Sequence, residues 1–173
     1  MITDEMLDQR AAFYARTAHK VAVKGQLKEY LSFRLGSQWY MADTHYLSGI
    51  MNMQRISRLP RSKTFLLGVM NLRGNIVLVA NLNVLLEQEQ DLNHQGSKII
   101  LTSVDGDLTA FAADEVLGVD AIDTQDIKPV ISTIQGLAAA FIEGLYQKEG
   151  KPFVLLNLKR VWLEMANQLG NQS

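Results

Sequence analysis

Enzymes and metal proteins cluster nucleophilic, titratable or metal-ligating side chains, and this sequence offers few such groups. It contains no cysteine, which excludes disulfides and thiolate sites. Its three histidines, His19, His45 and His94, lack the spacing of a metal site. Asp114 and Glu115 are adjacent, but neighbours on a strand point to opposite faces, which favours a role at a strand end or turn. We therefore predict a binding protein, not an enzyme, with no catalytic residue, metal or cofactor.

One arginine stands out in an apolar segment. Residues Phe65–Leu82 are expected to form two strands that fold back at Arg73–Asn75, with the glycine and asparagine supplying the positive φ of a tight turn. Arg73 is the only formal charge between Lys63 and Glu87. An unpaired buried charge is costly, so Arg73 is expected at the hairpin tip. Its charge also argues against a membrane span, because an arginine at mid-bilayer costs about 2.5–3.5 kcal/mol or more.

The net charge of -1 conceals two segments of opposite sign. Residues 44–86 contain no acid, and residues 99–127 contain no lysine or arginine. The first segment carries Arg55, Arg58, Arg61, Lys63 and Arg73, and the second carries Asp105, Asp107, Asp114, Glu115, Asp120, Asp123 and Asp126. Either the two segments neutralise each other, or they face different partners. The basic segment could bind nucleic acid, but the acidic segment and a pI near 6.3 disfavour that interpretation.

The elements that must position these residues are mostly short strands. Residues 1–25 are expected to form an N-terminal helix, because Met6, Phe13 and Val21 follow helical spacing and Gly25 can end it. Beyond Gly25 the pattern changes to alternating apolar residues separated by glycine turns. Short helices are expected near Asn83 and Asn157, and the second is expected to stop at Gly170. The polar, acidic start is not a secretory signal peptide, and the lack of cysteine favours the cytoplasm.

The strand pattern occurs twice. Residues 28–47 superpose on residues 98–117 at an offset of 70, and the hairpin starting at Phe65 superposes on that starting at Phe141 at an offset of 76. The chain therefore resembles an internal duplication. We predict a mainly β domain over residues 26–170 with two small barrels, formed roughly by residues 28–86 and 98–162, because each half is small for an independent core.

Four segments carry a resemblance to a known family. GVMNLRGNIVLVANL at Gly68–Leu82 resembles the signature hairpin of CheW-like coupling domains, with Leu59–Pro60 just upstream. FAADEVLGV at Phe111–Val119 and FIEGLYQKEGKPFVLLNL at Phe141–Leu158 are similar to later family segments. The resemblance covers roughly residues 28–165. The leading helix and residues 39–51 are more similar to the branch that serves type IV pilus (twitching) chemosensory systems.

The resemblance implies a fold of two five-stranded SH3-like β-barrels and a non-catalytic role in the cytoplasm. Members of the family couple methyl-accepting chemoreceptors to the regulatory domain of a CheA-type histidine kinase. It further implies that Leu47 and Gly68 contact the kinase and that Arg73, Lys98 and Val119 serve the receptor side. Each position also has a structural interpretation: strand packing for Gly68, barrel core for Leu47 and Val119, and a solvated tip for Arg73.

The chain departs from the family pattern at a pair of positions. The family commonly has a glutamate where this chain has Gly49, and that glutamate pairs with the arginine found here as Arg73. The ion pair of Arg73 is therefore expected from Asp43, from the acidic second half or from a partner protein. Lys98 stands where the family usually has an apolar residue. Two other functions stay open: a small barrel that binds nucleic acid, and a sensor domain that binds a ligand or peptide between its barrels.

Overall fold

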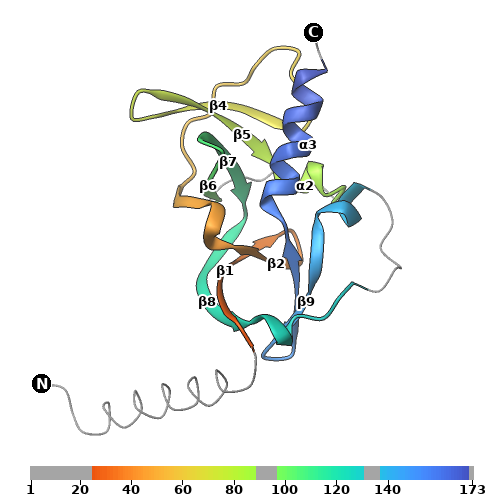
Figure 1. Cartoon of the computed structure of the whole chain (residues 1–173). Coiled ribbons are helices and arrows are strands. Elements are labelled where there is room, and N and C mark those ends of the chain that lie inside the picture. Colours follow the sequence, from red (N-terminus) through yellow and green to blue (C-terminus); the bar gives the residue numbers. More distant parts are fainter. Residues whose placement is uncertain (1–24, 89–96, 131–136, 172–173) are drawn as a thin grey trace, which may run out of the picture.

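The computed structural model describes residues 25–88, 97–130 and 137–171 (Figure 1). The predicted mainly β class is confirmed, with two five-stranded sheets and a C-terminal helix. The predicted N-terminal helix lies outside the described residues. The strands are β1 (Leu27–Leu35), β2 (Gln38–Asp43), β3 (Leu47–Asn52), β4 (Leu66–Leu72), β5 (Asn75–Asn81), β6 (Lys98–Val104), β7 (Asp107–Ala113), β8 (Glu115–Asp123), β9 (Ile142–Lys148) and β10 (Lys151–Leu156). The helices are α2 (Leu82–Leu85), α3 (Leu158–Gly170) and three short 3-10 helices, η1 (Thr44–Tyr46), η2 (Thr124–Asp126) and η3 (Leu137–Phe141).

The two halves of the chain are interleaved. Sheet A has the strand order β8-β1-β2-β10-β9, and sheet B has the order β3-β6-β7-β5-β4. The expectation that residues 28–86 and 98–162 each form one barrel is therefore wrong, because each sheet takes two strands from one half and three from the other. After β2 the chain crosses to sheet B, and the equivalent strand β8 pairs with β1 instead. Because the exchanged strands are equivalent, both sheets keep the same pattern of strand pairing.

The tight turns explain the repeated hairpins. In the β4–β5 hairpin, Leu72 pairs with Asn75, so the two-residue turn is Arg73–Gly74, with φ of +51° and +88°. The equivalent β9–β10 turn, Glu149–Gly150, has φ of +50° and +77°. Positive φ at both central residues is typical of a type I′ turn, whose twist matches that of the strands. The positive φ that was expected from glycine and asparagine thus comes from Arg73 and Gly74, and Asn75 already belongs to β5.

Each sheet is closed by the chain segment that follows its edge strand. After β3, Ser57 forms an antiparallel bridge to Val69 of β4, and after β8, Lys128 forms the same bridge to Leu145 of β9. The two edge strands of each sheet are thereby linked, which fits the description of two small barrels. Gly68 lies against the first bridge. A Cβ atom built there would lie 2.2 Å from the carbonyl oxygen of Ser57.

The main core joins the two sheets and α3. Phe33 of β1 and Phe111 of β7 are both fully buried in it. From α3, Leu158, Val161 and Met165 enter the same core at helical spacing. Asn157 caps this helix by accepting a hydrogen bond from the backbone N–H of Arg160. The predicted start near Asn157 and stop at Gly170 are confirmed.

Candidate interaction surfaces

The tip of the β4–β5 hairpin is an exposed surface that combines a charge with an apolar side chain. Arg73 is exposed, and among the described residues it makes no hydrogen bond or ion pair. Asn71 fixes the turn by accepting a hydrogen bond from the backbone N–H of Gly74 at 2.8 Å. Ile76 follows the turn and is 76% exposed. The hairpin projects from the rest of the protein (Figure 1), so its tip is available to a partner.

A shallow cavity of about 390 Å³ lies along this hairpin. Gln54, Arg55 and Ser57 form one wall, and residues 69–71 with Ile76 form the other. Ser57 is hydrogen-bonded to Val69 through both backbone groups, at 2.8 and 2.9 Å. This backbone pairing therefore holds the basic segment after β3 against β4, beside the hairpin tip.

The cations of the basic segment form no ion pair with any residue that the structure describes. In the described part of the chain, none of Arg55, Arg58, Arg61, Lys63 and Arg73 forms an ion pair. Three acids of the second half pair elsewhere, Asp114 and Glu115 with Arg34 and Asp120 with Lys148. Among the described residues, no ion pair therefore joins the basic segment to the acidic segment, as mutual neutralisation would require. The unpaired cations form a surface that favours an acidic partner.

Among residues 25–88, 97–130 and 137–171, Arg73 has no counterion to replace the missing glutamate. Asp43, the nearest candidate in the sequence, pairs with Lys28 at 3.6 Å and accepts a hydrogen bond from the backbone N–H of His45. Gly49 lies on β3 and pairs with Leu101 of β6. The described residues thus argue against Asp43 and against the acidic second half as the ion-pair partner of Arg73. A partner protein is the expected source that remains.

Leu47 and Gly68 occupy the two edge strands of sheet B. Leu47, on β3, is half-buried and packs against the main core, as the barrel-core interpretation predicts. Gly68, on β4, is buried, with φ of +144°. Its close contact with Ser57 confirms the packing interpretation, because any side chain there would collide with the backbone that closes the sheet. A glycine is thus required at this position whether or not it contacts a partner.

Val119 and Lys98 lie apart from each other. Val119 is on β8 of sheet A and is 49% exposed, so the barrel-core interpretation of this residue is wrong. Leu117, on the same strand, is 51% exposed, and the two form an apolar strip on a sheet edge. Lys98 begins β6 of sheet B and donates a hydrogen bond to Asn52 Oδ1 of β3. Four of the five predicted site residues thus belong to sheet B and one to sheet A.

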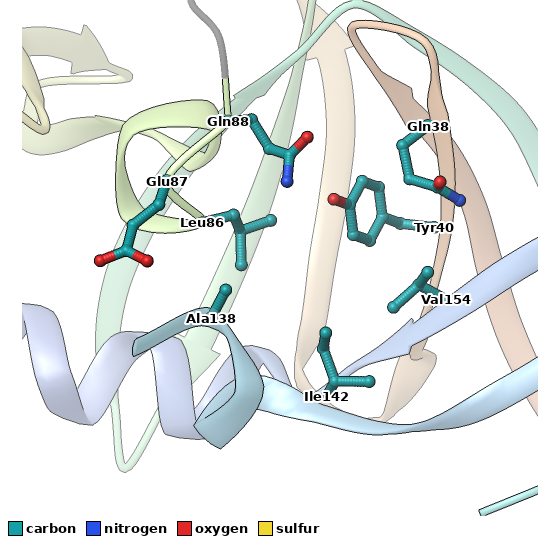
Figure 2. Close-up of a pocket in the computed structure, with 8 residues that line it drawn as sticks. All are labelled: Gln38, Tyr40, Leu86, Glu87, Gln88, Ala138, Ile142 and Val154. Atoms are coloured by element: carbon teal, nitrogen blue, oxygen red, sulfur yellow. The ribbon is translucent and has the colours of Figure 1, made fainter. Parts of the chain in front are cut away.

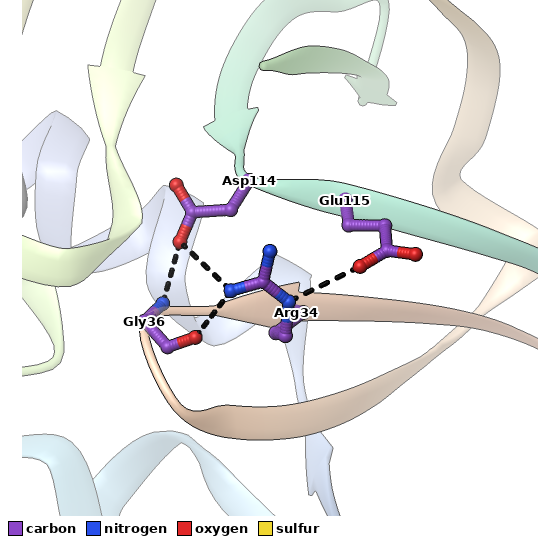
Figure 3. Close-up of polar contacts among 4 residues, drawn as sticks. All are labelled: Arg34, Gly36, Asp114 and Glu115. Carbon is purple, nitrogen blue, oxygen red and sulfur yellow. Dashed lines mark hydrogen bonds and ion pairs between the residues drawn. The ribbon is translucent and has the colours of Figure 1, made fainter. Parts of the chain in front are cut away.

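Asp114 and Glu115 lie where the chain passes from sheet B to sheet A (Figure 3). Asp114 Oδ2 accepts a hydrogen bond from the backbone N–H of Gly36 at 2.5 Å and lies 4.0 Å from Arg34 Nη1. Glu115 Oε2 accepts a hydrogen bond from Arg34 Nε at 3.2 Å. The predicted role at a strand end is confirmed. Sequence reasoning missed Arg34, because its partners lie about 80 residues away and no local pattern marks it.

A second cavity, of about 310 Å³, lies against sheet A where the chain leaves α2 (Figure 2). Tyr40, Ile142 and Val154 line it from the sheet, and Leu86 lines it from the end of α2. Burial raises the pKa of the Tyr40 hydroxyl above its usual value of 10.0. The described residues contain no group of three or more side chains that could hold a metal ion. They also contain no helix long and apolar enough to cross a membrane.

Comparisons with known proteins agree with the motifs. The family model for the CheW-like domain matches residues 29–164. The chemotaxis protein CheW of Thermotoga maritima is 27% identical over 146 residues, which cover 83% of this chain and 95% of that protein. CheW of Klebsiella aerogenes is 24% identical over 145 residues, covering 84% and 87%. Protein PilI of Pseudomonas aeruginosa is 23% identical over 120 residues, covering 69% and 67%.

The fold is also similar to a solved one. The scaffolding protein TtCheW from Thermoanaerobacter tengcongensis matches with a TM-score of 0.68 at 24% identity. The match covers 76% of this chain and 89% of that protein. At this identity the likeness concerns the fold, and it agrees with the predicted pair of small barrels.

Proposed function

Because the chain belongs to the CheW-like domain family, we propose that it is a non-catalytic adaptor. It couples the cytoplasmic tips of methyl-accepting chemoreceptors to the regulatory domain of a CheA-type histidine kinase. Relatives named as chemotaxis proteins support a scaffold role in chemotaxis signalling. The similarity to PilI supports a place in a type IV pilus system. The protein works in the cytoplasm, bound to membrane-embedded receptor arrays.

One observation carries the proposal: the signature hairpin ends in an arginine that forms no ion pair with any other described residue. Arg73 is exposed at the tip, beside the exposed Ile76 and the acid-free segment that includes Arg55. A surface with unpaired cations around an apolar centre fits a partner that presents acids around an apolar side chain. The acid on the kinase or receptor takes the place of the glutamate that the family commonly carries at the position of Gly49.

The kinase and receptor bind different parts of the protein in this proposal. In it, the kinase contacts Leu47 and Gly68, which lie on the edge strands of sheet B next to the basic segment. The receptor contacts Val119 on β8 of sheet A, where Leu117 extends the apolar surface. Arg73 and Lys98 contribute to the receptor response from sheet B. Two separate surfaces are what an adaptor needs, since both partners must be held at once.

Charge reversal at the two equivalent hairpin tips tests this proposal. Arg73→Glu reverses the unpaired charge on the β4–β5 turn, and Glu149→Arg is the matched control at the equivalent β9–β10 turn. Binding of each variant to the regulatory domain of the organism's CheA-type kinase and to a receptor tip is measured by titration calorimetry. We expect Arg73→Glu to weaken binding to at least one partner about 10-fold or more and Glu149→Arg to leave it unchanged. Equal affinity of the wild type and Arg73→Glu would contradict the proposed role of Arg73.

A further inference from the structure

The two sheets meet at two equivalent chain crossings, and these crossings are held differently. At the crossing from β7 to β8, the chain passes through Asp114. At the crossing from β2 to β3, it passes through η1. At the second crossing, the Thr44 hydroxyl donates a hydrogen bond to the carbonyl oxygen of Glu29 at 3.2 Å, and Lys28 forms an ion pair with Asp43, with side chains 45% and 34% exposed. An ion pair as exposed as this contributes little.

The crossing at Asp114 is held by a directional network (Figure 3). The Asp114 carboxylate accepts the backbone N–H of Gly36 in the β1–β2 turn, and the Asp114 backbone N–H donates to the carbonyl oxygen of Arg34 at 3.0 Å. Arg34 in turn donates through Nη1 to the carbonyl oxygen of Gly36 at 2.5 Å. Its guanidinium also lies over the ring of Trp39, 5.8 Å from the centroid. Asp114 therefore contacts β1 and the β1–β2 turn directly, and it contacts β2 indirectly through Arg34.

Apolar packing alone does not fix the angle between the two sheets, whereas directional contacts can. The core between the sheets consists of side chains such as Phe33 and Phe111, and apolar burial has little directional preference. Packed layers can slide or rotate slightly against one another at small cost. Charge-assisted hydrogen bonds, in contrast, require fixed distances and angles. The Asp114 side chain is only 17% exposed, so its contacts are weakly screened by solvent.

The same network sets the direction of the strand that carries Val119. Arg34 and Glu115 form the last pair of the β1–β8 ladder, next to the crossing. Beyond this pair the ladder is irregular between Ser32 and Phe33, opposite Gly118 with its φ of +133°. The strand β8 pairs with β1 from Glu115 to Asp123, with this one irregularity. Asp114 directly precedes this ladder, and its hydrogen bonds to Arg34 and Gly36 therefore set how the chain leaves sheet B and enters β8.

We propose that Asp114 and Arg34 are positioning residues that hold sheets A and B at one angle, and that they thereby fix how the receptor surface is presented relative to the kinase surface. The functional part of this inference rests on the proposed adaptor role. The structural part does not, because the angle exists in the isolated protein. Loss of the network leaves both binding surfaces intact but removes their fixed relation. Binding of each partner then persists while receptor-dependent control of the kinase is lost.

The experiment uses the absence of native cysteine. Ile76→Cys on sheet B and Lys151→Cys on sheet A, both exposed positions, are spin-labelled in the full chain, and the distance between the labels is measured by pulsed electron paramagnetic resonance. The wild-type background is expected to give one narrow distribution. Asp114→Ala is expected to broaden the distribution or to shift its centre by about 2 Å or more, the scale of interface shifts in switching proteins. Lys28→Ala, which removes the ion pair at the equivalent crossing, is the matched control and is expected to leave the distribution unchanged.

Asp114→Asn keeps an oxygen for the N–H of Gly36 but removes the charge that faces Arg34. It serves as the second variant should Asp114→Ala fail to fold, and an intermediate broadening is expected. A wild-type distribution in the folded Asp114 variants would overturn the structural inference. Titration with the kinase domain and the receptor tip, followed by a kinase assay with receptor, tests the functional part. Failure of the wild type to bind either partner would refute the adaptor role and leave the distance result standing, whereas retained receptor control in Asp114→Ala would refute the positioning role alone.

Discussion

Replacing Gly68 by alanine is expected to open sheet B at its closing bridge. The added Cβ would lie 2.2 Å from the carbonyl oxygen and 2.8 Å from the carbonyl carbon of Ser57, so the backbone of Ser57 must move. That movement breaks the two hydrogen bonds between Ser57 and Val69, each worth about 1 kcal/mol net. A side chain at φ of +144° adds about 1–3 kcal/mol of backbone strain.

The net loss of stability follows from these contributions. The alanine also reduces the conformational entropy of the unfolded chain, which offsets about 0.4–1 kcal/mol of this loss of stability. The free energy of unfolding is therefore expected to fall by about 2–5 kcal/mol, which corresponds to a decrease in Tm of roughly 4–20 °C for a chain of this size. Urea unfolding followed by circular dichroism measures the first quantity, and a thermal scan measures the second.

Gly49→Ala is the matched control, because it lies in the same sheet. A Cβ there would have only Leu101 Cδ1 nearby, at an ordinary 3.7 Å. We expect its stability to equal the wild type or to exceed it by up to about 1 kcal/mol. Equal stability of Gly68→Ala and wild type would refute the steric argument. Loss of kinase binding in a Gly68 variant therefore reports on a contact only when the variant's stability has been measured as well.

Three further variants test separate parts of the account. Arg73→Ala is expected to change the free energy of unfolding by less than about 0.5 kcal/mol, because the side chain is exposed and unpaired; a larger loss in urea unfolding would reveal an intramolecular partner. Asn157→Ala removes the cap of α3 and is expected to cost about 1 kcal/mol, whereas an unchanged urea midpoint would argue against the cap. Burial raises the pKa of Tyr40, so the folded state holds its proton more tightly than the unfolded state, and stability is lost as the pH rises above about 10. Tyr40→Phe is expected to make that alkaline loss shallower in unfolding measured from pH 8 to 11, and an identical slope would contradict the assignment to Tyr40.

Local features of the fold were predictable, and the exchange of strands was not. Glycine turns and alternating apolar residues identified the hairpins, and the apolar spacing after Asn157 identified α3, because such signals depend on neighbours in the sequence. The choice of β8 over β3 as the partner of β1 depends on two strands with equivalent positions in a duplicated chain. Both pairings satisfy the same local pattern, so only the whole fold distinguishes them.

The same reasoning explains the outcome for the site residues. Arg73 was marked by its residue type, a lone charge at a turn, and Gly68 was marked by the resemblance, with strand packing as its structural interpretation; both positions have the predicted structural feature. The structural interpretation of Val119, a place in the barrel core, followed from the usual burial of apolar residues, but Val119 lies on an edge strand and is half exposed. No sequence pattern identified Arg34, because its role depends on contacts with Asp114 and Gly36 at the crossing between the sheets.

In the proposed adaptor role, one molecule of this protein holds a kinase and a receptor at the same time. Sedimentation velocity on the full chain mixed with the regulatory domain of the organism's CheA-type kinase and a receptor hairpin tip measures this directly. We expect a binary complex with each partner and a ternary complex when both are present. Sedimentation of all three as separate species at tens of micromolar, with the protein folded by circular dichroism, would contradict it.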